Sequence, residues 1–311
     1  MIELKGLTRD YGAFRALDHL DMTIQDGELH GFVGPNGAGK TTTMRILATL
    51  LPMSGGTAVV DGVDLHKRPR AVRKIVGYMP DFFGVYDRLK TSEYLDFYAR
   101  CYAMSARDRA RMIDQLLDLV NLSSRKDSYV DVLSRGMKQR LCLAHALIHD
   151  PKFLILDEPA SGMDPRARAE MKEILLRLRE MGKSVLISSH ILPELSEMCD
   201  ALTIIDKGKL VFSGSVEALS RKMQGDAPLE IRLARDADDR AIDDVVSILS
   251  EFPGVTSIEA LEEKVLLVEL MQDDKRVAAL IRLLVERNIP IIDVHRRRMN
   301  LEHVFLEVTE G

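Results

Sequence analysis

The sequence contains no stretch that resembles a membrane span or a cleaved leader. No apolar run in its 311 residues approaches the ~20 residues that a transmembrane helix needs. The N-terminal residues MIELKGLTRD lack an apolar h-region, so we expect no secretory signal peptide. Any role at a membrane is therefore expected to depend on a partner protein.

Cysteine is scarce, and neither sign of charge is in large excess. The three cysteines, Cys101, Cys142 and Cys199, lie far apart, show no metal-ligand spacing and are odd in number. This pattern favours a reduced, cytosolic protein. The net charge of −5 predicts no general affinity for nucleic acid. With 46% hydrophobic and 29% charged residues, the chain is typical of a soluble protein with a packed core, and its length suggests two domains.

A glycine-rich loop, GPNGAGKT, lies between an expected strand and an expected helix. It follows the apolar run Leu29–Val33 and precedes a helix-like run over 42–50, the context that identifies G-x-x-x-x-G-K-[ST] as a phosphate loop. Backbone N–H groups of such a loop surround phosphates, and the helix N-terminus adds its positive end. Lys40 supplies a charge, and the Thr41 hydroxyl is placed to ligate Mg²⁺. The alternative is a glycine-rich turn with an exposed lysine. The predicted ATP-binding residues are Gly34, Pro35, Asn36, Gly37, Ala38, Gly39, Lys40, Thr41 and Thr42.

Short alternating runs around this loop predict strands, and hence an α/β layer. We expect these strands at Met1–Leu4, Leu20–Ile24, Thr57–Val60 and Arg73–Met79. Tyr11 lies between the first two. Its ring either stacks on adenine, which is worth ~1–3 kcal/mol, or belongs to the core or a sheet edge.

The next segment has helical rather than strand periodicity. One helix is expected from Thr91, with Ser92 as its cap, and another over Ser105–Leu119. We interpret residues from about 85 to 150 as a mostly helical subdomain inserted into the α/β core. Its last helix follows Ser134, so this helix N-terminus is either a second anion site or an ordinary capped helix.

Polar residues follow the next two expected strands. Asp157 and Glu158 end the apolar run 153–156, at the edge of an α/β sheet where ligands bind. Asp157 can hold Mg²⁺ through water, and Glu158 can orient or deprotonate the attacking water; the alternative is a solvated acidic strand end. His190 follows the strand Val185–Ser189 at the same edge, although a lone histidine is usually structural.

Five motifs in family order resemble those of the ATP-binding cassette (ABC) family. The resemblance covers residues 1 to about 220, which we interpret as an ABC ATP-binding domain. The motifs are Walker A over 34–42, the signature LSRGMKQR over 133–140 in place of LSGGQ, Walker B over 153–159, the D-loop Ala160–Asp164 and the H-loop Ser188–His190.

The resemblance implies a P-loop ABC ATPase that uses ATP and Mg²⁺. It implies Glu158 and His190 as catalytic residues, with His190 contacting the γ-phosphate, and Thr41 and Asp157 on the metal side. It also implies a homodimer, because the signature of one cassette faces the phosphate loop of another. The residues that would contact ATP across that dimer are Ser134, Arg135, Gly136 and Met137, and Asp164 belongs to the D-loop.

The chain departs from the family pattern at two positions. Asp81 stands where the family usually has a glutamine that touches Mg²⁺, and we hypothesise that Asp81 keeps this metal-side role. The alternative is that its charge repels the γ-phosphate and slows turnover. Arg135 replaces the usual glycine of the signature, and its side chain either adds charge near the nucleotide or points away.

The C-terminal part reads as a separate small domain over 226–311. A polar linker, Arg221–Pro228, precedes elements in the order β-α-β-β-α-β, which is ferredoxin-like. A last helix is expected over 300–308. We find no catalytic constellation here and interpret the domain as an interaction or dimer-stabilising module. Its ending, Leu301–Leu306, resembles the LEDVFL-type ending of cassettes in ABC-2-type exporters.

Together these features favour the ATPase subunit of an ABC-2-type exporter. We expect it in the cytoplasm, peripheral on the inner face of the cell membrane, driving export through a separate transmembrane permease. A soluble ABC ATPase acting on ribosomes or DNA fits less well with a single cassette, no long heptad run and an acidic balance. A third possibility is a regulatory module that binds ATP and hydrolyses it weakly.

Overall fold

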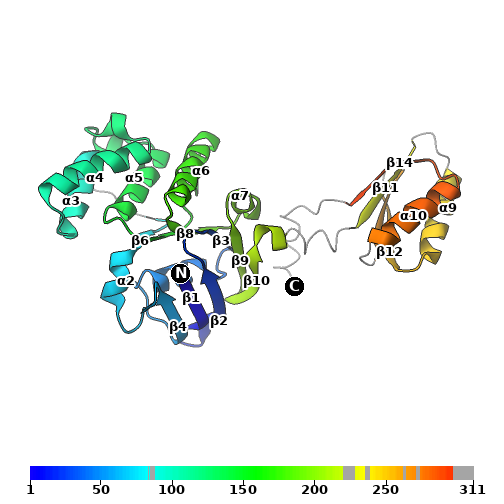
Figure 1. Cartoon of the computed structure of the whole chain (residues 1–311), viewed down its shortest axis with the longest axis horizontal. Helices are drawn as coiled ribbons and strands as arrows, with labels where there is room; N and C mark the ends of the chain where they lie inside the picture. Colours follow the sequence, from blue (N-terminus) through cyan, green and yellow to red (C-terminus); the bar gives the residue numbers. More distant parts are fainter. Residues whose placement is uncertain are drawn as a thin grey trace. The chain divides into compact units, whose positions relative to one another are not determined.

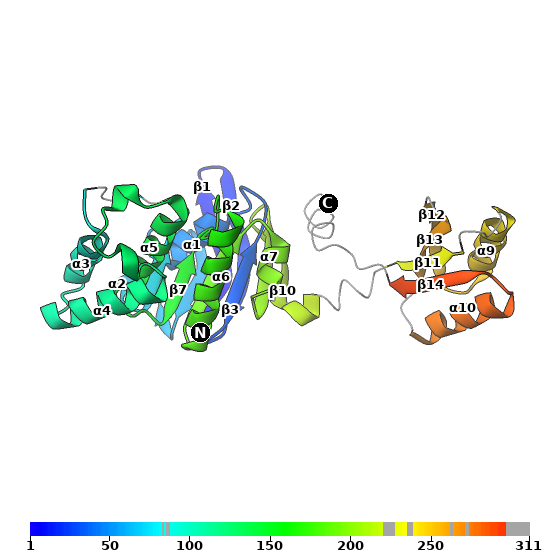
Figure 2. The ribbon, with the colours of Figure 1, turned by 90° about the horizontal axis from the view of Figure 1, so that it is seen from above.

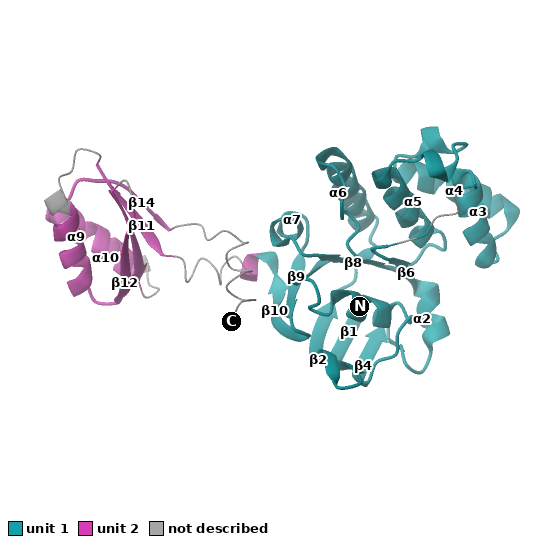
Figure 3. Ribbon diagram, turned by 180° about the vertical axis from the view of Figure 1, so that it is seen from behind, with its two compact units in different colours: residues 1–216, 311 teal, residues 217–310 magenta. Residues whose placement is uncertain are grey.

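The computed structural model describes residues 1–82, 84, 88–219, 228–234, 239–261, 264–270 and 274–296. The chain divides into two compact units, one over Met1–Val216 and a second that begins at Glu217 (Figure 3). Within the described ranges, no helix is both long and apolar enough to cross a membrane.

A six-stranded sheet forms the centre of the first unit (Figure 1). Its order is β10 (Lys209–Ser215), β9 (Ala201–Asp206), β3 (Leu29–Val33), β8 (Ser184–Ser189), β7 (Phe153–Leu156) and β6 (Val76–Met79). Strands β9, β3, β8, β7 and β6 are parallel, and β10 pairs antiparallel with β9. Every residue of β3, β7 and β8 is buried, as expected for parallel strands covered on both faces. The loops after β3, β7 and β8 therefore leave the sheet at one edge.

A second, antiparallel sheet packs against the helix that follows β3. Its order is β2 (Phe14–Ile24), β1 (Ile2–Tyr11), β4 (Gly55–Val60) and β5 (Val63–Asp64). The helix is α1 (Lys40–Leu47), and its Met44 shares one buried cluster with Leu4 of β1 and Phe153 of β7. This shared core fixes α1, and with it the loop before α1, between the two sheets.

Helices fill the chain between β6 and β7. They are α3 (Thr91–Cys101), α4 (Ala106–Leu119) and α5 (Arg135–Leu147), with 3₁₀ turns at Ser123–Arg125 and Val130–Val132; α3 and α4 lie to one side of the sheet in Figure 2. No β-strand was found in the described part of this segment. Two ring stacks join α3 to α5: the Tyr98 and His145 ring centroids are 3.5 Å apart, and those of Tyr102 and His149 are 4.2 Å apart. The rest of the unit contains α6 (Pro165–Glu180) and α7 (Leu192–Ser196).

Three local expectations from the sequence were wrong. Strands β1 and β2 run on to a two-residue turn after Tyr11, so they are longer than predicted. The run expected as a strand from Arg73 begins with the end of helix α2 (Pro69–Ile75), because Pro69 in the first turn favours a helix start. The N-cap of α3 is Lys90 rather than Ser92, since the backbone N–H of Lys90 donates to the Glu93 carboxylate over 2.8 Å.

The second unit has the ferredoxin-like topology that the element order predicted. Its elements are β11 (Leu229–Leu233), α9 (Asp239–Glu251), β12 (Val255–Leu261), β13 (Val265–Leu270), α10 (Asp274–Glu286) and β14 (Ile291–Arg296). The sheet order is β12-β13-β11-β14, and every neighbouring pair is antiparallel. Apolar residues of both helices pack on one core with β11 and β13. The predicted helix over 300–308 lies outside the described residues, as does most of the predicted linker.

Candidate nucleotide site

The glycine-rich loop connects β3 to α1, as its sequence predicted. Gly39 is the N-cap of α1 and has a φ of +110°. A Cβ on Gly39 would lie 2.7 Å from Leu17 Cδ2 and 3.0 Å from the Ala16 carbonyl oxygen. A side chain is therefore excluded here both by the backbone conformation and by the close approach of β2.

Lys40 lies beneath this loop and is buried, with 6% of its surface exposed. Its Nζ donates to the carbonyl oxygens of Gly34 over 2.6 Å and Pro35 over 3.2 Å, and lies 3.6 Å from Glu158 Oε1. Burial lowers the pKa of Lys40, while the carboxylates of Glu158 and Asp157 act in the opposite direction. The ammonium group is thus held at the loop by acceptors that a phosphate can replace.

Ser188 of β8 fixes both carboxylates that follow β7. Its hydroxyl donates to Asp157 Oδ1 over 2.8 Å and accepts from the Glu158 backbone N–H over 2.9 Å. Asp157 is 1% exposed, and its Oδ2 is buried without a hydrogen-bond partner in the protein. Glu158 has a φ of +50°, in the left-handed region that few non-glycine residues adopt.

The orphaned Asp157 Oδ2 fits a role in holding Mg²⁺, directly or through water. Within the described residues there is no group of three or more His, Cys, Asp and Glu that could hold a metal ion. Proteins usually hold Mg²⁺ by one or two carboxylates together with waters and substrate phosphates. Thr41 and Asp81, the other predicted metal-side residues, line one cavity with Lys40 and Glu158, whereas Asp157 is not among the residues that line it.

His190 follows β8 and faces Glu158. Its Nδ1 lies 3.1 Å from Oε2 and 3.3 Å from Oε1 of that carboxylate. The imidazole is 49% exposed, whereas the Glu158 side chain is only 14% exposed. The ring therefore covers a sheltered carboxylate and keeps its own outer edge open to the cavity.

One cavity of about 540 Å³ brings most of the predicted site together. It is lined by Tyr11, Phe14, Ala16, Pro35, Asn36, Gly37, Gly39, Lys40, Thr41, Thr42, Asp81, Glu158, Ser161 and His190. Gly34, Ala38 and Asp157 lie behind this lining. Tyr11 is 46% exposed at the rim, and the guanidinium of Arg9 lies 4.5 Å from its ring centroid. The Tyr11 ring is thus partly exposed to the cavity that the phosphate loop also lines.

Three lining residues, Phe14, Ala16 and Ser161, were not predicted from the sequence as site residues. Phe14 is 65% exposed and pairs with Tyr11 across the β1–β2 turn, so two aromatic rings stand at the rim. Ser161 lies in the loop after Glu158, and its backbone N–H donates to the Glu158 carbonyl over 3.0 Å. Extending the strand alternation of apolar and polar residues as far as Phe14 would have placed this residue on the hairpin. No pattern in the linear sequence places Ser161 at the cavity.

The signature residues do not line this cavity. Ser134 is the N-cap of α5, and its hydroxyl accepts from the Met137 N–H over 3.3 Å. Arg135 and Gly136 form the first turn of α5. Asp164 is the N-cap of α6, where its Oδ1 accepts from the Ala167 N–H over 2.9 Å. One chain therefore presents a phosphate loop and a signature at separate places.

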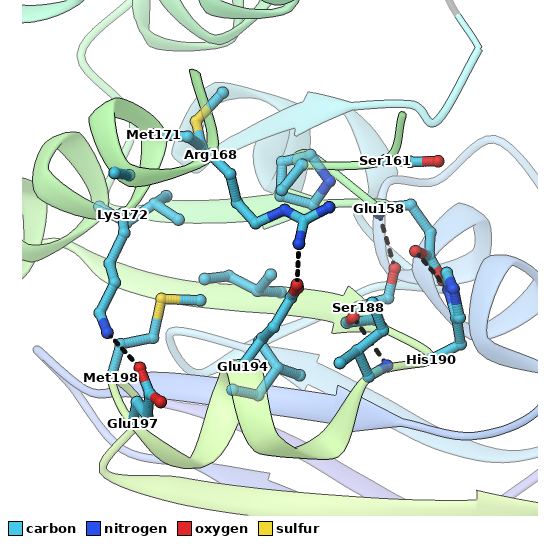
Figure 4. Close-up of a pocket in the computed structure, with 18 of the residues that line it drawn as sticks. Glu158, Ser161, Arg168, Met171, Lys172, Ser188, His190, Glu194, Glu197 and Met198 are labelled. Atoms are coloured by element: carbon cyan, nitrogen blue, oxygen red, sulfur yellow. Dashed lines mark hydrogen bonds and ion pairs between the residues drawn. The ribbon is translucent and has the colours of Figure 1, made fainter. Parts of the chain in front are cut away.

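A second pocket, of about 340 Å³, is lined in part by Glu158 and His190 (Figure 4). Its walls come from the loop after Glu158, from the end of β8 and from α6 and α7. Two ion pairs join the helices at this pocket, Arg168 to Glu194 and Lys172 to Glu197, each with an N–O distance of 2.7 Å. Residues of the loop between β7 and α6, among them Ser161 and Gly162, line this pocket together with these helices.

Comparison with known proteins shows which family the chain belongs to. The ABC transporter family pattern matches residues 17–161. The uncharacterized ABC transporter ATP-binding protein YhcH of Bacillus subtilis (strain 168) is 34% identical over 99% of this chain and 96% of its own length. The daunorubicin resistance ATP-binding protein DrrA2 of Streptomyces coeruleorubidus is 33% identical over 99% and 94%. The Nod factor export ATP-binding protein I of Burkholderia orbicola (strain AU 1054) is 32% identical over 99% and 96%.

Solved structures show the same fold. The ATP-binding subunit of an ABC transporter superposes with a TM-score of 0.65 at 29% identity, covering 71% of this chain and 92% of that one. The dimeric cassette MJ0796 superposes with a TM-score of 0.64 at 23% identity, covering 70% and 99%. The fold and the site thus define a P-loop ATPase of the cassette type. The chain belongs to the ATP-binding proteins of the ABC transporter family, and it is an ATPase of that kind.

Proposed function

We propose that this protein is the ATP-hydrolysing subunit of an exporter, closing on ATP as a pair of copies and driving substrate through a separate membrane permease. The observation that carries the proposal is the meeting of Lys40, Glu158 and His190 in one cavity at the ends of parallel strands. Phosphoryl transfer needs positioned charges and an oriented water rather than elaborate covalent chemistry. These three residue types supply both.

Each side chain has a role in hydrolysis that follows from its position in the cavity. The loop N–H groups and Lys40 bind the phosphates, and Lys40 exchanges its loop carbonyl acceptors for phosphate oxygens. Glu158 accepts a proton from the attacking water, since its carboxylate is sheltered and faces the cavity. His190 holds that carboxylate in place through Nδ1, and its outer edge reaches the γ-phosphate. When Mg²⁺ is bound, near Thr41, Asp81 and Asp157, it neutralises charge on the phosphates.

A second copy completes the site. The signature residues Ser134 to Met137 lie on α5, away from the cavity lined by their own chain. A two-fold dimer brings Ser134 and Gly136 of this patch to the partner's phosphates and makes two equal sites. The dimeric MJ0796 cassette, which has the same fold, supports this arrangement.

The permease is expected to dock on the helical segment. A groove of about 570 Å³ lies between α3 and α4, lined by residues that include Leu89, Phe97 and Ile113. Phe82, next to Asp81, is 91% exposed, and Phe97 is 45% exposed. Exposed aromatic side chains beside a groove are typical of protein-binding surfaces. Asp81 lines the nucleotide cavity and Phe82 follows it directly, so an exposed aromatic side chain stands next to a residue of that cavity.

The names of the relatives support export rather than import. They include a daunorubicin resistance protein and a Nod factor export protein. The proposal places the chain in the cytoplasm, held at the inner face of the membrane by its permease, with the second unit as an interaction or dimer-stabilising module. The cargo is expected to contact the permease.

Expression of the tagged chain in its native host, followed by purification from membranes, tests the proposal. We expect recovery from membranes together with a multi-span protein, and loss of that recovery for Phe97→Asp with ATP binding unchanged. A chain that stays in the soluble fraction, bound to ribosomes or DNA, would favour the soluble ATPase instead. Intact ATP binding without hydrolysis would favour the regulatory module.

A further inference from the structure

The first two turns of α5 are joined to the loop after Glu158 and to the start of α6. The contacts come from α5 residues at helical spacing, so they share one face of the helix. They pair Arg135 with Gly162, Gly136 with Ala167, Gln139 with Ser161 and Arg140 with Glu170. The signature helix and the D-loop of one chain are therefore linked directly.

The contact between Arg135 and Gly162 sets this chain apart from the usual signature, which has glycine at the position of Arg135. A Cβ on Gly162 would lie 2.4 Å from Arg135 Cζ and 2.6 Å from each terminal guanidinium nitrogen. The flat guanidinium therefore rests on the bare backbone of Gly162. Gly162 has a φ of +65°, a conformation that favours glycine in any case.

Hydrogen bonds of the D-loop connect this contact to the backbone of Glu158. The Ser161 carbonyl oxygen accepts from Gln139 Nε2 over 2.9 Å, and the Ser161 N–H donates to the Glu158 carbonyl over 3.0 Å. Arg135 and Gln139 thus hold adjacent residues of a turn that begins at Glu158. The position of the turn affects the Glu158 backbone, which already has a positive φ.

The turn also borders a pocket that α5 does not line. Glu158, Ser161 and Gly162 line the pocket of about 340 Å³ in Figure 4, and no α5 residue is among the residues that line it. The Glu158 end of the turn is held by the hydrogen bond from its N–H to Ser188. The Ser161 and Gly162 end is held by the contacts from α5.

We propose that Arg135 is a positioning residue for hydrolysis: its guanidinium, packed on Gly162, holds the D-loop so that Glu158 faces the attacking water. The proposal rests on the role of Glu158 given above. It assigns Arg135 a contact within its own chain and explains why the chain tolerates arginine where a glycine is usual. Planarity of the side chain matters here, because only a flat group packs closely on a peptide.

Steady-state kinetics of Arg135→Ala tests this assignment. We expect kcat to fall about fivefold to twentyfold while KM for ATP stays within about twofold, since a displaced general base slows the chemical step without weakening binding. Arg135→Lys should be no better, because it keeps the charge and loses the flat group. Arg166→Ala is the matched control: it removes a nearby arginine that is 90% exposed, and it should leave kcat unchanged.

A double-mutant cycle provides a second test. Gly162→Ala displaces the guanidinium, so both substitutions remove the same contact. The double variant should therefore show a smaller fold decrease in kcat than the product of the decreases in the two single variants. The unfolding midpoint of each variant shows whether it is folded.

Several results would overturn the assignment. The first is an unchanged kcat in Arg135→Ala. The second is a raised KM for ATP in Arg135→Ala that Arg135→Lys restores to normal. The third is loss of ATP-dependent dimerisation when Arg135→Ala is combined with Glu158→Gln. The last two would make Arg135 a phosphate contact across the dimer. Absence of hydrolysis by the unaltered protein would instead contradict the proposed function itself.

Discussion

His190 Nδ1 lies 3.1 Å from Glu158 Oε2 and 3.3 Å from Oε1, so the ring edge spans both carboxylate oxygens. An ionised carboxylate only accepts hydrogen bonds, which requires the proton of a neutral imidazole to be on Nδ1. Nε2 is then the acceptor on the outer edge of the ring. This tautomer leaves Glu158 oriented and still basic, as a group that takes a proton from water must be.

The first prediction concerns this pair. Glu158→Gln keeps the shape and removes the base, so we expect the ATPase rate to fall about 10²–10³-fold with ATP affinity unchanged. His190→Ala should lower the ATPase rate less, by about tenfold to a hundredfold, because the base remains but loses the hydrogen bond that positions it. Single-turnover hydrolysis and nucleotide-binding titrations measure the two quantities. A Glu158→Gln protein retaining more than a tenth of the normal rate would show that the base lies elsewhere.

The second prediction concerns Asp157. Its Oδ2 is buried without a partner, so Asp157→Asn should raise the Mg²⁺ concentration for half-maximal hydrolysis at least about tenfold. The Ser188 hydroxyl donates to the carboxylate and still has an acceptor in the amide oxygen, which should preserve the fold. Mg²⁺ titrations at saturating ATP measure this shift. An unaltered Mg²⁺ requirement would contradict the role assigned to Asp157.

The third prediction concerns Asp81, which lines the nucleotide cavity in place of the usual glutamine. If Asp81 keeps the metal-side role, Asp81→Ala should lower the ATPase rate and increase the Mg²⁺ requirement. A faster Asp81→Ala enzyme would indicate that the carboxylate repels the γ-phosphate. No change in either quantity would remove Asp81 from the site, and Asp81→Gln serves as the comparison closest to other cassettes.

The fourth prediction concerns the aromatic rim. Tyr11→Ala should raise KM for ATP about fivefold to a hundredfold, which corresponds to the ~1–3 kcal/mol of a base stacked on an aromatic ring. Tyr11→Phe should behave like the unaltered protein, because the stacking face remains. Phe14→Ala is the control, since Phe14 lies opposite Tyr11 in the hairpin. A larger effect from Phe14→Ala would move the stacking role to that ring.

Much of the nucleotide cavity could be predicted because its residues are close in sequence. Residues 34–42 form a single loop and helix start, and Asp157, Glu158 and His190 each follow a strand by one or two positions. Parallel strands that end at one edge bring such positions together, so an ordered set of short motifs was enough. The ferredoxin-like unit was predictable for a similar reason, since its elements alternate in a simple order.

The remaining features depend on contacts between distant residues. No linear pattern indicates that Ser188 hydrogen-bonds both Asp157 and Glu158, or that Gln139 binds the Ser161 carbonyl. The end of α2 was mistaken for a strand because Ile75 and Val76 are both apolar and β-branched, a pattern typical of strands. Contact of the signature with ATP remains a prediction, since it requires a second copy.

The last prediction concerns His145, which is stacked on Tyr98 inside the helical segment. Burial, followed by the nearby His149, lowers the pKa of His145 from 6.5 to about 4. A lowered histidine pKa means that the unfolded chain takes up the proton first. The stability is therefore complete above pH 6.5 and is lost as the pH falls from 6.5 towards 4. By linkage this amounts to about 2–3 kcal/mol of unfolding free energy between pH 7 and pH 4.5.

His145→Phe should remove that part of the pH dependence while keeping a ring to stack on Tyr98. Urea unfolding at pH 7 and pH 4.5 measures it: the difference between the two free energies should shrink by about 2 kcal/mol in the variant. His149, whose pKa burial also lowers, still contributes in the same direction, so some slope should remain. His66→Gln, at an exposed histidine, should leave the difference unaltered. An equal pH dependence in His145→Phe and the unaltered protein would mean that the stacked ring takes up its proton in the folded state.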